Sequence, residues 1–206
     1  MRTRVLAAAA LIVLVGCERA AERPSAPPTP PEPPLTLDLT CAAFAEVDND
    51  ALIERYGAEN VSTEIVPGPE GQSYEATLLY ANDPARRLEI VWRDEAKTAP
   101  AAVSAEGAGW TGPSGLAVGA DLARVEELNG RPFRLWGFGW DYGGWVSEWN
   151  GGAFASAGGC TPRVHFDART PNNTSALGDS EFASDSAEVR AADPAVTEIG
   201  LSFRAQ

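Results

Sequence analysis

The sequence predicts an α+β domain in which small helices pack on an antiparallel sheet. Two short apolar segments each begin after an aspartate and end at a glycine, which is typical of capped helices. Several other segments alternate apolar and polar residues, as strands with one buried face do. Each predicted helix is followed by a predicted β-hairpin, so the regions 48–94 and 121–152 indicate a degenerate repeat of an α-β-β unit.

The N-terminal segment differs in composition from the rest of the chain. Arg2 and Arg4 precede an apolar run that is too short to span a bilayer, which predicts a signal peptide over residues 1–16. The run ends in Leu-Val-Gly-Cys at positions 14–17. This motif is similar to the lipobox of bacterial lipoproteins, and the resemblance implies that Cys17 is acylated and anchors the chain to a lipid bilayer. An ordinary secretory signal with an incidental cysteine is the alternative.

Residues 17–35 form a predicted tether. The segment is rich in proline and polar residues, so it cannot bury a core and favours an extended polyproline II conformation. In lipoproteins of this type, aspartate directly after the lipidated cysteine favours the inner membrane, and here that residue is Glu18. The resemblance therefore implies a cell-envelope location at the outer membrane, facing the periplasm. Residues 36–206 are expected to form a single α+β globular domain.

Charge and cysteine content limit the partners and the chemistry. The formal net charge is −13, which argues against a nucleic-acid partner. Cys41 and Cys160 remain once Cys17 is assigned, and in an oxidising compartment they are expected to form a disulfide. Free thiols or a metal pair are the alternative. The sequence holds no His/Cys set for zinc and no glycine-rich phosphate loop with a lysine, so no cofactor and no metal site are expected.

The first half of the domain predicts one helix and one hairpin. Residues 37–41 alternate as a short strand does. Asp48 then caps a helix that ends at Gly57. After a Pro/Gly loop, the segments 76–80 and 88–92 alternate on either side of an Asn-Asp-Pro turn and predict a hairpin with one apolar face.

The second half predicts a further helix before the aromatic region and a strand at the end. Asp121 caps a helix that Gly130 terminates. The single histidine, His165, stands in an alternating run and is expected to be a half-exposed strand residue. Residues 180–192 predict a weakly amphipathic helix, and residues 196–203 predict a closing strand.

The segment from Trp136 to Gly152 interleaves aromatic residues with glycines. Gly143-Gly144 between aromatic runs predicts the two-residue turn of a β-hairpin. Because strand side chains alternate, one face of this hairpin would be aromatic, formed by Trp136, Phe138, Trp140, Tyr142, Trp145 and Trp149. The opposite face would be lined by glycines and would carry two carboxylates, Asp141 and Glu148.

The aromatic face has more than one interpretation. Large aromatic side chains on a sheet usually belong to the core, where these would pack under the second predicted helix. An exposed row would instead form a platform for sugar rings or for a partner's side chains, because contiguous exposed apolar patches mark binding sites. A split would place Phe138 and Trp149 inside. The rim would then hold the candidate binding residues Trp140, Tyr142 and Trp145.

Asp141 and Glu148 are the candidate catalytic residues. On the predicted hairpin they share a face, and two carboxylates flanked by aromatics are typical of glycoside cleavage, which needs an acid pair at a defined spacing. The alternative is that Asp141 bonds turn amides while Glu148 faces solvent. The sequence contains no Gly-x-Ser-x-Gly elbow and no evident nucleophile–base pair, so catalysis is not the favoured function.

Two local resemblances add to these predictions. The pattern Gly-Leu-x-Val-Gly at 115–119, with the apolar and helix-ending residues up to Pro132, resembles the helical entry of small outer-membrane assembly lipoproteins of the SmpA/OmlA type and of the β-lactamase-inhibitor-protein fold. That resemblance implies helices packed on a small antiparallel sheet. The segment 129–144 is similar to a family of bacterial exported proteins with no assigned activity, and it implies no mechanism.

These features predict a lipid-anchored cell-envelope protein that acts as a non-catalytic binding module. Its partners would be the lipid bilayer, reached through acylated Cys17, and an envelope protein or glycan bound near the aromatic segment. The alternative is a glycan-binding or glycan-hydrolysing protein that uses Asp141, Glu148 and the rim aromatics.

Overall fold

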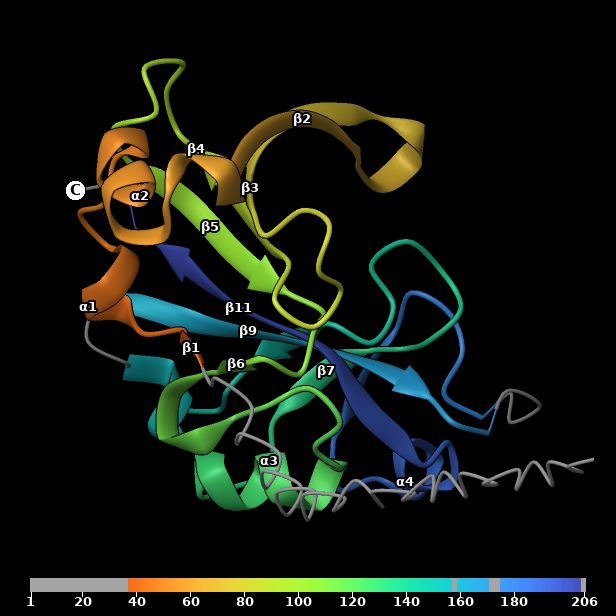
Figure 1. The fold of residues 1–206 in the computed structure, drawn as a ribbon. Helices are drawn as coiled ribbons and strands as arrows, with labels where there is room; N and C mark the ends of the chain where they lie inside the picture. The colour runs from red at the N-terminus through yellow and green to blue at the C-terminus, as the bar shows by residue number, and fades with distance from the viewer. Residues whose placement is uncertain (1–36, 157–158, 171–174, 205–206) are drawn as a thin grey trace, which may run out of the picture. The chain divides into compact units, whose positions relative to one another are not determined.

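A six-stranded antiparallel sheet with the strand order β2-β3-β4-β5-β11-β9 forms the centre of the domain (Figure 1). The computed structural model describes residues 37–156, 159–170 and 175–204. The strands of this sheet are β2 (Val61–Pro67), β3 (Ser73–Leu79), β4 (Leu88–Trp92), β5 (Pro100–Ala105), β9 (Cys160–Ala168) and β11 (Pro194–Phe203). The α+β class is confirmed. The predicted signal peptide, Cys17 and the tether lie outside the described residues.

Two small sheets and several short helices accompany the central sheet. β1 (Leu37–Asp38) pairs in parallel with β6 (Trp110–Thr111), and β7 (Arg134–Trp136) lies between β10 (Glu181–Ala183) and β8 (Val146–Glu148). The α-helices are α1 (Cys41–Phe44), α2 (Asn49–Tyr56), α3 (Leu122–Asn129) and α4 (Ala187–Ala191). Single-turn 3₁₀ helices span Ala58–Asn60, Pro69–Gly71, Pro113–Gly115 and Ala153–Ser156. Across the described residues, no helix is long and apolar enough to cross a bilayer.

The two longer helices begin and end where their caps predict. Asp48 accepts a hydrogen bond of 2.8 Å from the backbone N–H three residues later, and α2 ends at Gly57. Asp121 accepts an equivalent bond of 2.7 Å, and α3 ends at Gly130 in the left-handed conformation. Each helix precedes antiparallel strands, as the predicted α-β-β order requires. The strands after α2 join the central sheet, however, whereas those after α3 form the separate sheet of β7 and β8.

Two segments differ from the predictions. Residues 180–192 do not form one helix, because Glu181–Ala183 pairs with β7 as strand β10 and only Ala187–Ala191 is helical. The strand β2 was not predicted, although Val61, Thr63 and Ile65 give it a β-branched composition. In both cases the conformation depends on pairing with a distant strand or on an edge position.

The core lies on one face of the central sheet. Alternating residues of β4, β5, β9 and β11 are almost wholly buried there, namely Leu88, Ile90, Val103, Val164, Phe166, Ile199 and Leu201. The helices, the small sheets and their connections contribute Phe44, Leu52, Trp110, Val125, Phe133 and Leu135 to the same cluster. Burial of each such side chain stabilises the fold by about 1.5–3 kcal/mol. The opposite face of the sheet has a different composition and carries the candidate site.

The aromatic segment does not form the predicted two-residue hairpin. β7 pairs with β8, with Leu135 opposite Val146, and a loop of residues 137–145 joins the two strands. This aromatic loop is closed at its base, where the Trp136 N–H donates to the Trp145 carbonyl at 2.9 Å. The assignment of faces that assumed a tight turn at residues 143–144 is therefore wrong.

Close backbone packing explains the glycine pair at the base of the loop, against β9 for Gly144 and within the loop for Gly143. Gly144 adopts φ 75°, its N–H donates to the Trp136 carbonyl at 3.0 Å, and its carbonyl accepts from the Phe166 N–H at 3.0 Å. A Cβ at Gly144 would clash with the Phe166 carbonyl oxygen, and a Cβ at Gly143 would meet the Gly137 carbonyl oxygen at 2.7 Å. The glycines therefore allow two backbones to approach each other, and they do not form a hairpin tip.

Cys41 and Cys160 form the disulfide that the sequence predicts. The two Cα atoms lie 5.7 Å apart and are separated by 119 residues in the sequence. The bridge joins the first residue of α1 to the first residue of β9. It therefore connects the beginning of the domain to the sheet strand that also holds the aromatic loop.

Replacing both residues (Cys41→Ala with Cys160→Ala) is expected to lower the free energy of unfolding by about 4–5 kcal/mol, because the long closed loop restricts the unfolded chain. Urea unfolding followed by tryptophan fluorescence measures this change. Dithiothreitol should destabilise the wild-type chain to a similar extent and leave the double variant unaffected. Equal stability of the oxidised and reduced chains would contradict the prediction.

Candidate ligand-binding groove

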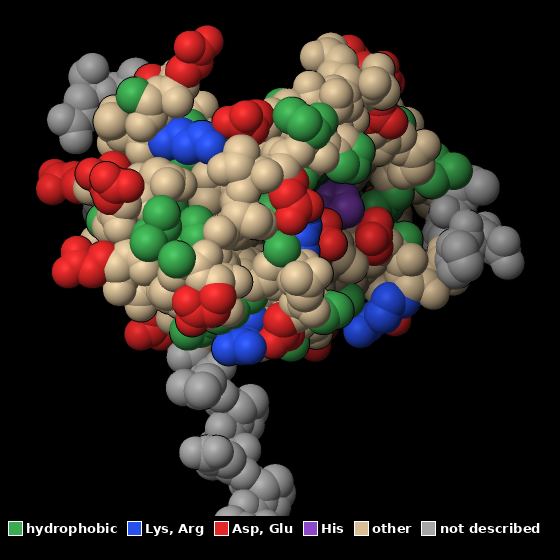
Figure 2. Space-filling view, turned by 45° about the horizontal axis from the view of Figure 1, so that its top comes forward, with side chains coloured by type: hydrophobic (Ala, Val, Ile, Leu, Met, Phe, Trp, Pro, Cys, Tyr) green, Lys and Arg blue, Asp and Glu red, His purple; other side chains and the backbone are tan. Residues whose placement is uncertain are grey.

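A cavity of about 790 Å³ lies on the face of the central sheet opposite the core. We call it the groove. Its floor is formed by β4, β5, β9 and β11, one wall by the aromatic loop with the ends of β7 and β8, and the other wall by the β2–β3 hairpin. Figure 2 shows acidic and apolar side chains around the single histidine on this side of the molecule.

The floor consists of two rows of residues that cross the sheet in register. The first row is Glu89, Ser104, Gly200 and Arg163. The second row is Val91, Ala102, Ser202 and Thr161. All of these residues except Gly200 line the groove. The floor is therefore mostly polar and formed by small side chains, with two charged residues at the ends of one row.

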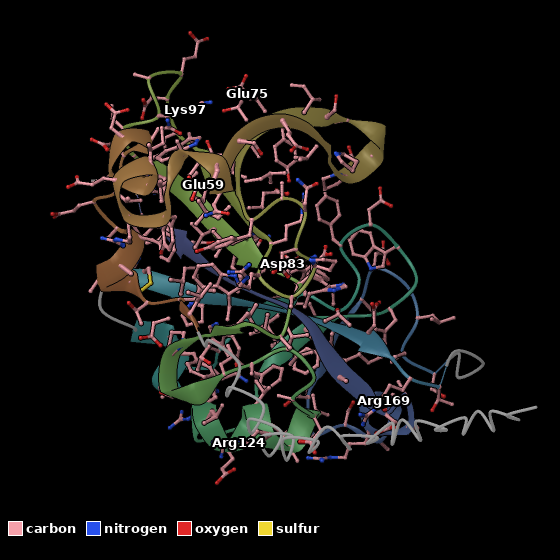
Figure 3. All side chains as sticks on the ribbon, in the orientation of Figure 1. Glu59, Glu75, Asp83, Lys97, Arg124 and Arg169 are labelled. Carbon is pink, nitrogen blue, oxygen red and sulfur yellow. A yellow bond between two sulfur atoms is a disulfide. The ribbon has the colours of Figure 1, made fainter. Side chains whose placement is uncertain are left out.

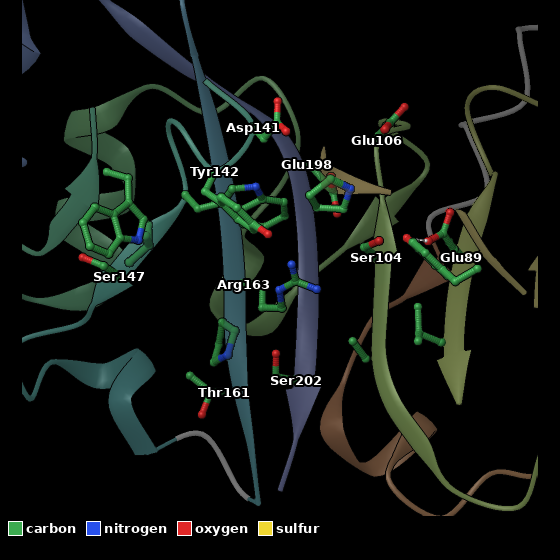
Figure 4. A pocket seen from close by; sticks show the side chains of 18 of the residues that line it. Glu89, Ser104, Glu106, Asp141, Tyr142, Ser147, Thr161, Arg163, Glu198 and Ser202 are labelled. Atoms are coloured by element: carbon green, nitrogen blue, oxygen red, sulfur yellow. Dashed lines mark hydrogen bonds between the residues drawn. The ribbon is translucent and has the colours of Figure 1, made fainter. Parts of the chain in front are cut away.

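Glu198 projects into the groove near the centre of the floor (Figure 4). A bulge between Val196 and Glu198 shifts the phase of β11, so that Glu198 lies opposite His165 on β9. Burial raises the pKa of the Glu198 carboxyl, while a hydrogen bond with Ser104 and the positive charge of Arg163 act in the opposite direction. The carboxyl thus lies half-buried beside a guanidinium and a hydroxyl.

The aromatic wall presents two large rings to solvent. Trp140 is 37% exposed and Tyr142 is 40% exposed, whereas Phe138 and Trp149 are buried. The rings pack edge to face, with centroids 6.1 Å apart for Trp136 and Trp140 and 5.3 Å apart for Trp140 and Tyr142. The Trp140 indole N–H also donates to the Gly137 carbonyl at 2.9 Å, which fixes the ring orientation. The split of the aromatic residues between core and rim is therefore observed.

His165 attaches the aromatic loop to the sheet. Its Nε2 lies 2.9 Å from the Gly143 carbonyl oxygen, and its Nδ1 lies 2.8 Å from the Thr197 hydroxyl. Because a carbonyl oxygen only accepts, Nε2 carries a proton, and Nδ1 accepts from the hydroxyl in the neutral ring. The ring also packs 4.9 Å from Trp145, whose other neighbour is the Arg163 guanidinium at 4.4 Å from the ring centroid. Both ring nitrogens are therefore engaged in positioning the loop.

The β2–β3 wall is held from both sides. On the groove side, the Tyr74 hydroxyl donates to Glu89 at 2.7 Å, and burial together with this bond raises the pKa of Tyr74. On the outer side, the Lys97 ammonium lies 3.1 Å from the Glu75 carboxylate and 2.7 Å from the Thr63 hydroxyl (Figure 3). These contacts keep the hairpin curved over the floor.

The two walls meet at their outer ends. The Glu70 N–H, in the turn between β2 and β3, donates to the Asp141 carboxylate at 2.8 Å across 71 residues of sequence. Both residues are exposed, so the bond contributes about 0.5–1.5 kcal/mol. Asp141 therefore bonds a backbone amide, as the structural interpretation of this residue expected, although the amide belongs to a different loop.

The predicted site residues separate into two groups. Trp140, Tyr142, Trp145 and Asp141 all line the groove. Glu148 is exposed on β8 opposite Arg134 and is not among the lining residues. The groove therefore does not bring the two candidate catalytic carboxylates together.

Glu198, Arg163 and Ser104 were not identified from the sequence. They come from three strands that are far apart in the chain, so no local motif contains them. One signal was present: the apolar residues of β11 are spaced by three between Val196 and Ile199 and by two afterwards. That change of spacing indicates a bulge and assigns Glu198 to the polar face.

Within the described parts of the chain, no group of three or more His, Cys, Asp or Glu residues is placed to hold a metal ion.

Comparison with known proteins gives no relative for this chain. No family model matches it, and the searches of curated proteins and of solved structures return no significant match. The two local sequence resemblances thus stay predictions, and the interpretation of the groove rests on its geometry.

Replacing Glu198 by glutamine (Glu198→Gln) is expected to make stability less dependent on pH. The pKa of Glu198 is raised above its ordinary value of 4.5, so its contribution to stability is present below that value and is lost as the pH rises through the folded-state pKa. As the pH rises from about 4 to about 7, wild type should therefore lose stability relative to the variant, whose glutamine does not titrate. Urea unfolding at both pH values measures the difference. The exposed control Glu148→Gln should show a smaller change, and an equal change in both variants would contradict the prediction.

Proposed function

We propose that the mature chain is a lipid-anchored protein of the bacterial cell envelope that binds a cell-wall polymer in the groove without converting it. The lipobox-like motif ending at Cys17 and the proline-rich tether support the anchored, exported location. The groove supports the binding role, and the tether would let the domain reach a polymer beyond the membrane surface.

One observation carries the proposal: Trp140 and Tyr142 are exposed at the mouth of a preformed concave groove. Exposed apolar surface is unfavourable unless a partner covers it, so such surface commonly marks a binding site. Ligand sites are typically concave, partly aromatic and equipped with a few placed polar groups. The groove has each of these properties, and its volume of about 790 Å³ lies within the usual range for such sites.

The contacts of the polar groups favour binding over catalysis. Asp141 bonds the opposite wall, and both nitrogens of His165 are occupied, Nε2 by the Gly143 carbonyl of the aromatic loop and Nδ1 by the Thr197 hydroxyl of β11. One observation favours the hydrolytic alternative, since Glu198 has a raised pKa and shares the groove with other carboxylates, as a general acid does. Release of reducing ends from purified peptidoglycan, abolished in Glu198→Gln, would support that alternative and overturn the non-catalytic assignment.

The binding role predicts that Trp140→Ala weakens binding to purified peptidoglycan sacculi. Removal of a large ring at a binding surface commonly costs about 2 kcal/mol or more, so affinity should fall by more than about tenfold. Co-sedimentation of the acylated chain in detergent with the sacculi measures binding. The matched control is Ile65→Ala, which removes an apolar side chain that is 69% exposed on β2 outside the groove. Failure of the wild-type chain to sediment, or equal loss in the control, would overturn the proposal.

The anchored location predicts that the mature chain begins at Cys17 and carries acyl groups. Mass spectrometry of the membrane-extracted protein measures both properties. Cys17→Ser should abolish acylation and remove the protein from the mature membrane-anchored pool. A mature protein that retains residues 1–16 and lacks an acyl group would contradict this prediction.

A further inference from the structure

We infer that the groove recognises the carbohydrate part of its ligand, as an uncharged oligosaccharide held between the aromatic wall and the pair formed by Glu198 and Arg163. This inference rests on the proposed function, because it names the ligand class of the same groove. It follows from four properties of the lining: its charge, its backbone pairing, its polarity and the arrangement of its aromatic rings.

The charge of the lining disfavours anionic ligands. The groove is lined by the carboxylates of Glu89, Glu106, Asp141 and Glu198 but by only two arginines. Arg87 lies 3.7 Å from Glu89, and Arg163 lies over the Trp145 ring. Neither guanidinium is free of a neighbouring partner, so a phosphate or an acidic sugar would meet a net negative surface.

A cationic ligand is disfavoured by the position of Arg163. This side chain already covers one aromatic face of the wall, at 4.4 Å from the Trp145 centroid. Its positive charge also lowers the pKa of the Glu198 carboxyl, against the effect of burial. An added ammonium group would therefore compete with a cation that the fold itself supplies.

The backbone of the floor disfavours a peptide bound as an added strand. β4, β5 and β11 each pair with a strand on both sides, so their N–H and C=O groups are used within the sheet. On β9, the Phe166 N–H is also used, by the Gly144 carbonyl. Strand addition requires an open sheet edge, and the groove lies on the face of the sheet.

The polarity of the floor disfavours an acyl chain. Beside Val91 and Ala102, the floor carries the hydroxyls of Ser104, Ser202 and Thr161, with Glu198 and Arg163 next to them. An apolar chain would bury these groups without satisfying them, which is costly. A Cβ at Gly200 would clash with the Val103 carbonyl oxygen, so the close packing of β11 and β5 requires glycine at this floor position.

The remaining arrangement suits a sugar ring. A pyranose has C–H groups on its faces, which pack on aromatic rings such as Trp140 and Tyr142, and hydroxyls around its edge. Each hydroxyl both donates and accepts, so neighbouring hydroxyls can donate to the Glu198 carboxylate and accept from the Arg163 guanidinium. Figure 4 shows Tyr142, Glu198 and Arg163 around one part of the groove, with Ser202 and Thr161 further along the floor. The cavity volume of about 790 Å³ accommodates a di- or trisaccharide.

The test uses the full acylated chain in detergent and follows tryptophan fluorescence on titration. The probes are triacetylchitotriose, which is uncharged, its fully deacetylated cationic form, trigalacturonate as the anionic sugar, and a peptidoglycan stem tetrapeptide. The uncharged trisaccharide should bind at least about tenfold more tightly than the other probes, and it should compete with sacculi in the sedimentation assay.

The variants Arg163→Gln and Tyr142→Ala should each weaken binding of the trisaccharide by about tenfold or more. Arg124→Gln, at an exposed arginine of α3 outside the groove, is the matched control and should bind as wild type does. Circular dichroism shows whether the variants fold. If Arg163→Gln does not fold, Tyr142→Ala still tests the assignment.

The outcomes separate the two proposals. In one outcome the chain sediments with sacculi, and the tetrapeptide or trigalacturonate blocks this sedimentation whereas the uncharged trisaccharide does not. That result would overturn the ligand class and leave the binding role intact. Absence of sedimentation would overturn the binding role itself. Binding of the trisaccharide that is unchanged in both groove variants would overturn the assignment of these residues.

Discussion

The attachment of the aromatic loop to β9 is the constraint on which the groove depends. Gly144 lies against the Phe166 backbone, and His165 reaches from the same strand to the Gly143 carbonyl. Each hydrogen bond contributes only about 0.5–1.5 kcal/mol, but together they fix the base of the loop on the sheet. Without them the rings of Trp140 and Tyr142 would have no defined position relative to the floor. A glycine is needed at position 144 because only that residue permits both the positive φ and the close approach.

The central sheet has two different faces, one that forms the core and one that forms the floor of the groove. One face carries the aliphatic and aromatic core, and the other carries small polar residues with a carboxylate and a guanidinium. Antiparallel sheets tolerate one solvated face because their backbone groups pair within the sheet. The floor of the groove is therefore formed by the fold itself, since the core packs on the other face of the same sheet. A preformed site reduces the entropy lost on binding.

Much of the fold could be predicted because its signals are local. The caps of α2 and α3 are single aspartates and glycines at the helix ends, and the strands alternate over a few residues. The glycine pair at 143–144 shows where local signals stop being sufficient. Glycine serves both tight turns and close backbone approaches, and the sequence does not tell which contact partner, here Phe166, selects the second use. The predicted tight turn at 143–144 was wrong for this reason, although the strands on either side of the loop do pair in antiparallel order.

The candidate site was harder to predict because it assembles across strands. Arg163 and Glu198 are brought together by the pairing of β9 with β11, and Ser104 by the pairing of β11 with β5. The bulge before Glu198 changes which side of the sheet that residue faces, so strict alternation from Val196 would have assigned it wrongly. Sequence patterns identify the aromatic wall because its residues are contiguous in the chain. The residues of the polar floor come together only through the pairing register of separate strands, which no local pattern reveals.

The position of the Glu198–Arg163 pair at the surface of the sheet, and not within the core, explains how it could serve recognition. Complete burial of two charges costs more than their attraction returns unless every remaining hydrogen-bonding site is satisfied. In the groove the carboxyl is only half-buried, with a raised pKa and a single hydroxyl partner from Ser104. Its remaining acceptor sites, and donors of the guanidinium, face a cavity where water or a ligand can complete them. A ligand whose groups both donate and accept can replace that water with little loss of hydrogen bonding. Its apolar surface would at the same time contact the aromatic rings beside the pair. Selectivity then comes from the mismatch of other ligands, because an apolar or singly charged group would leave one member of the pair unsatisfied.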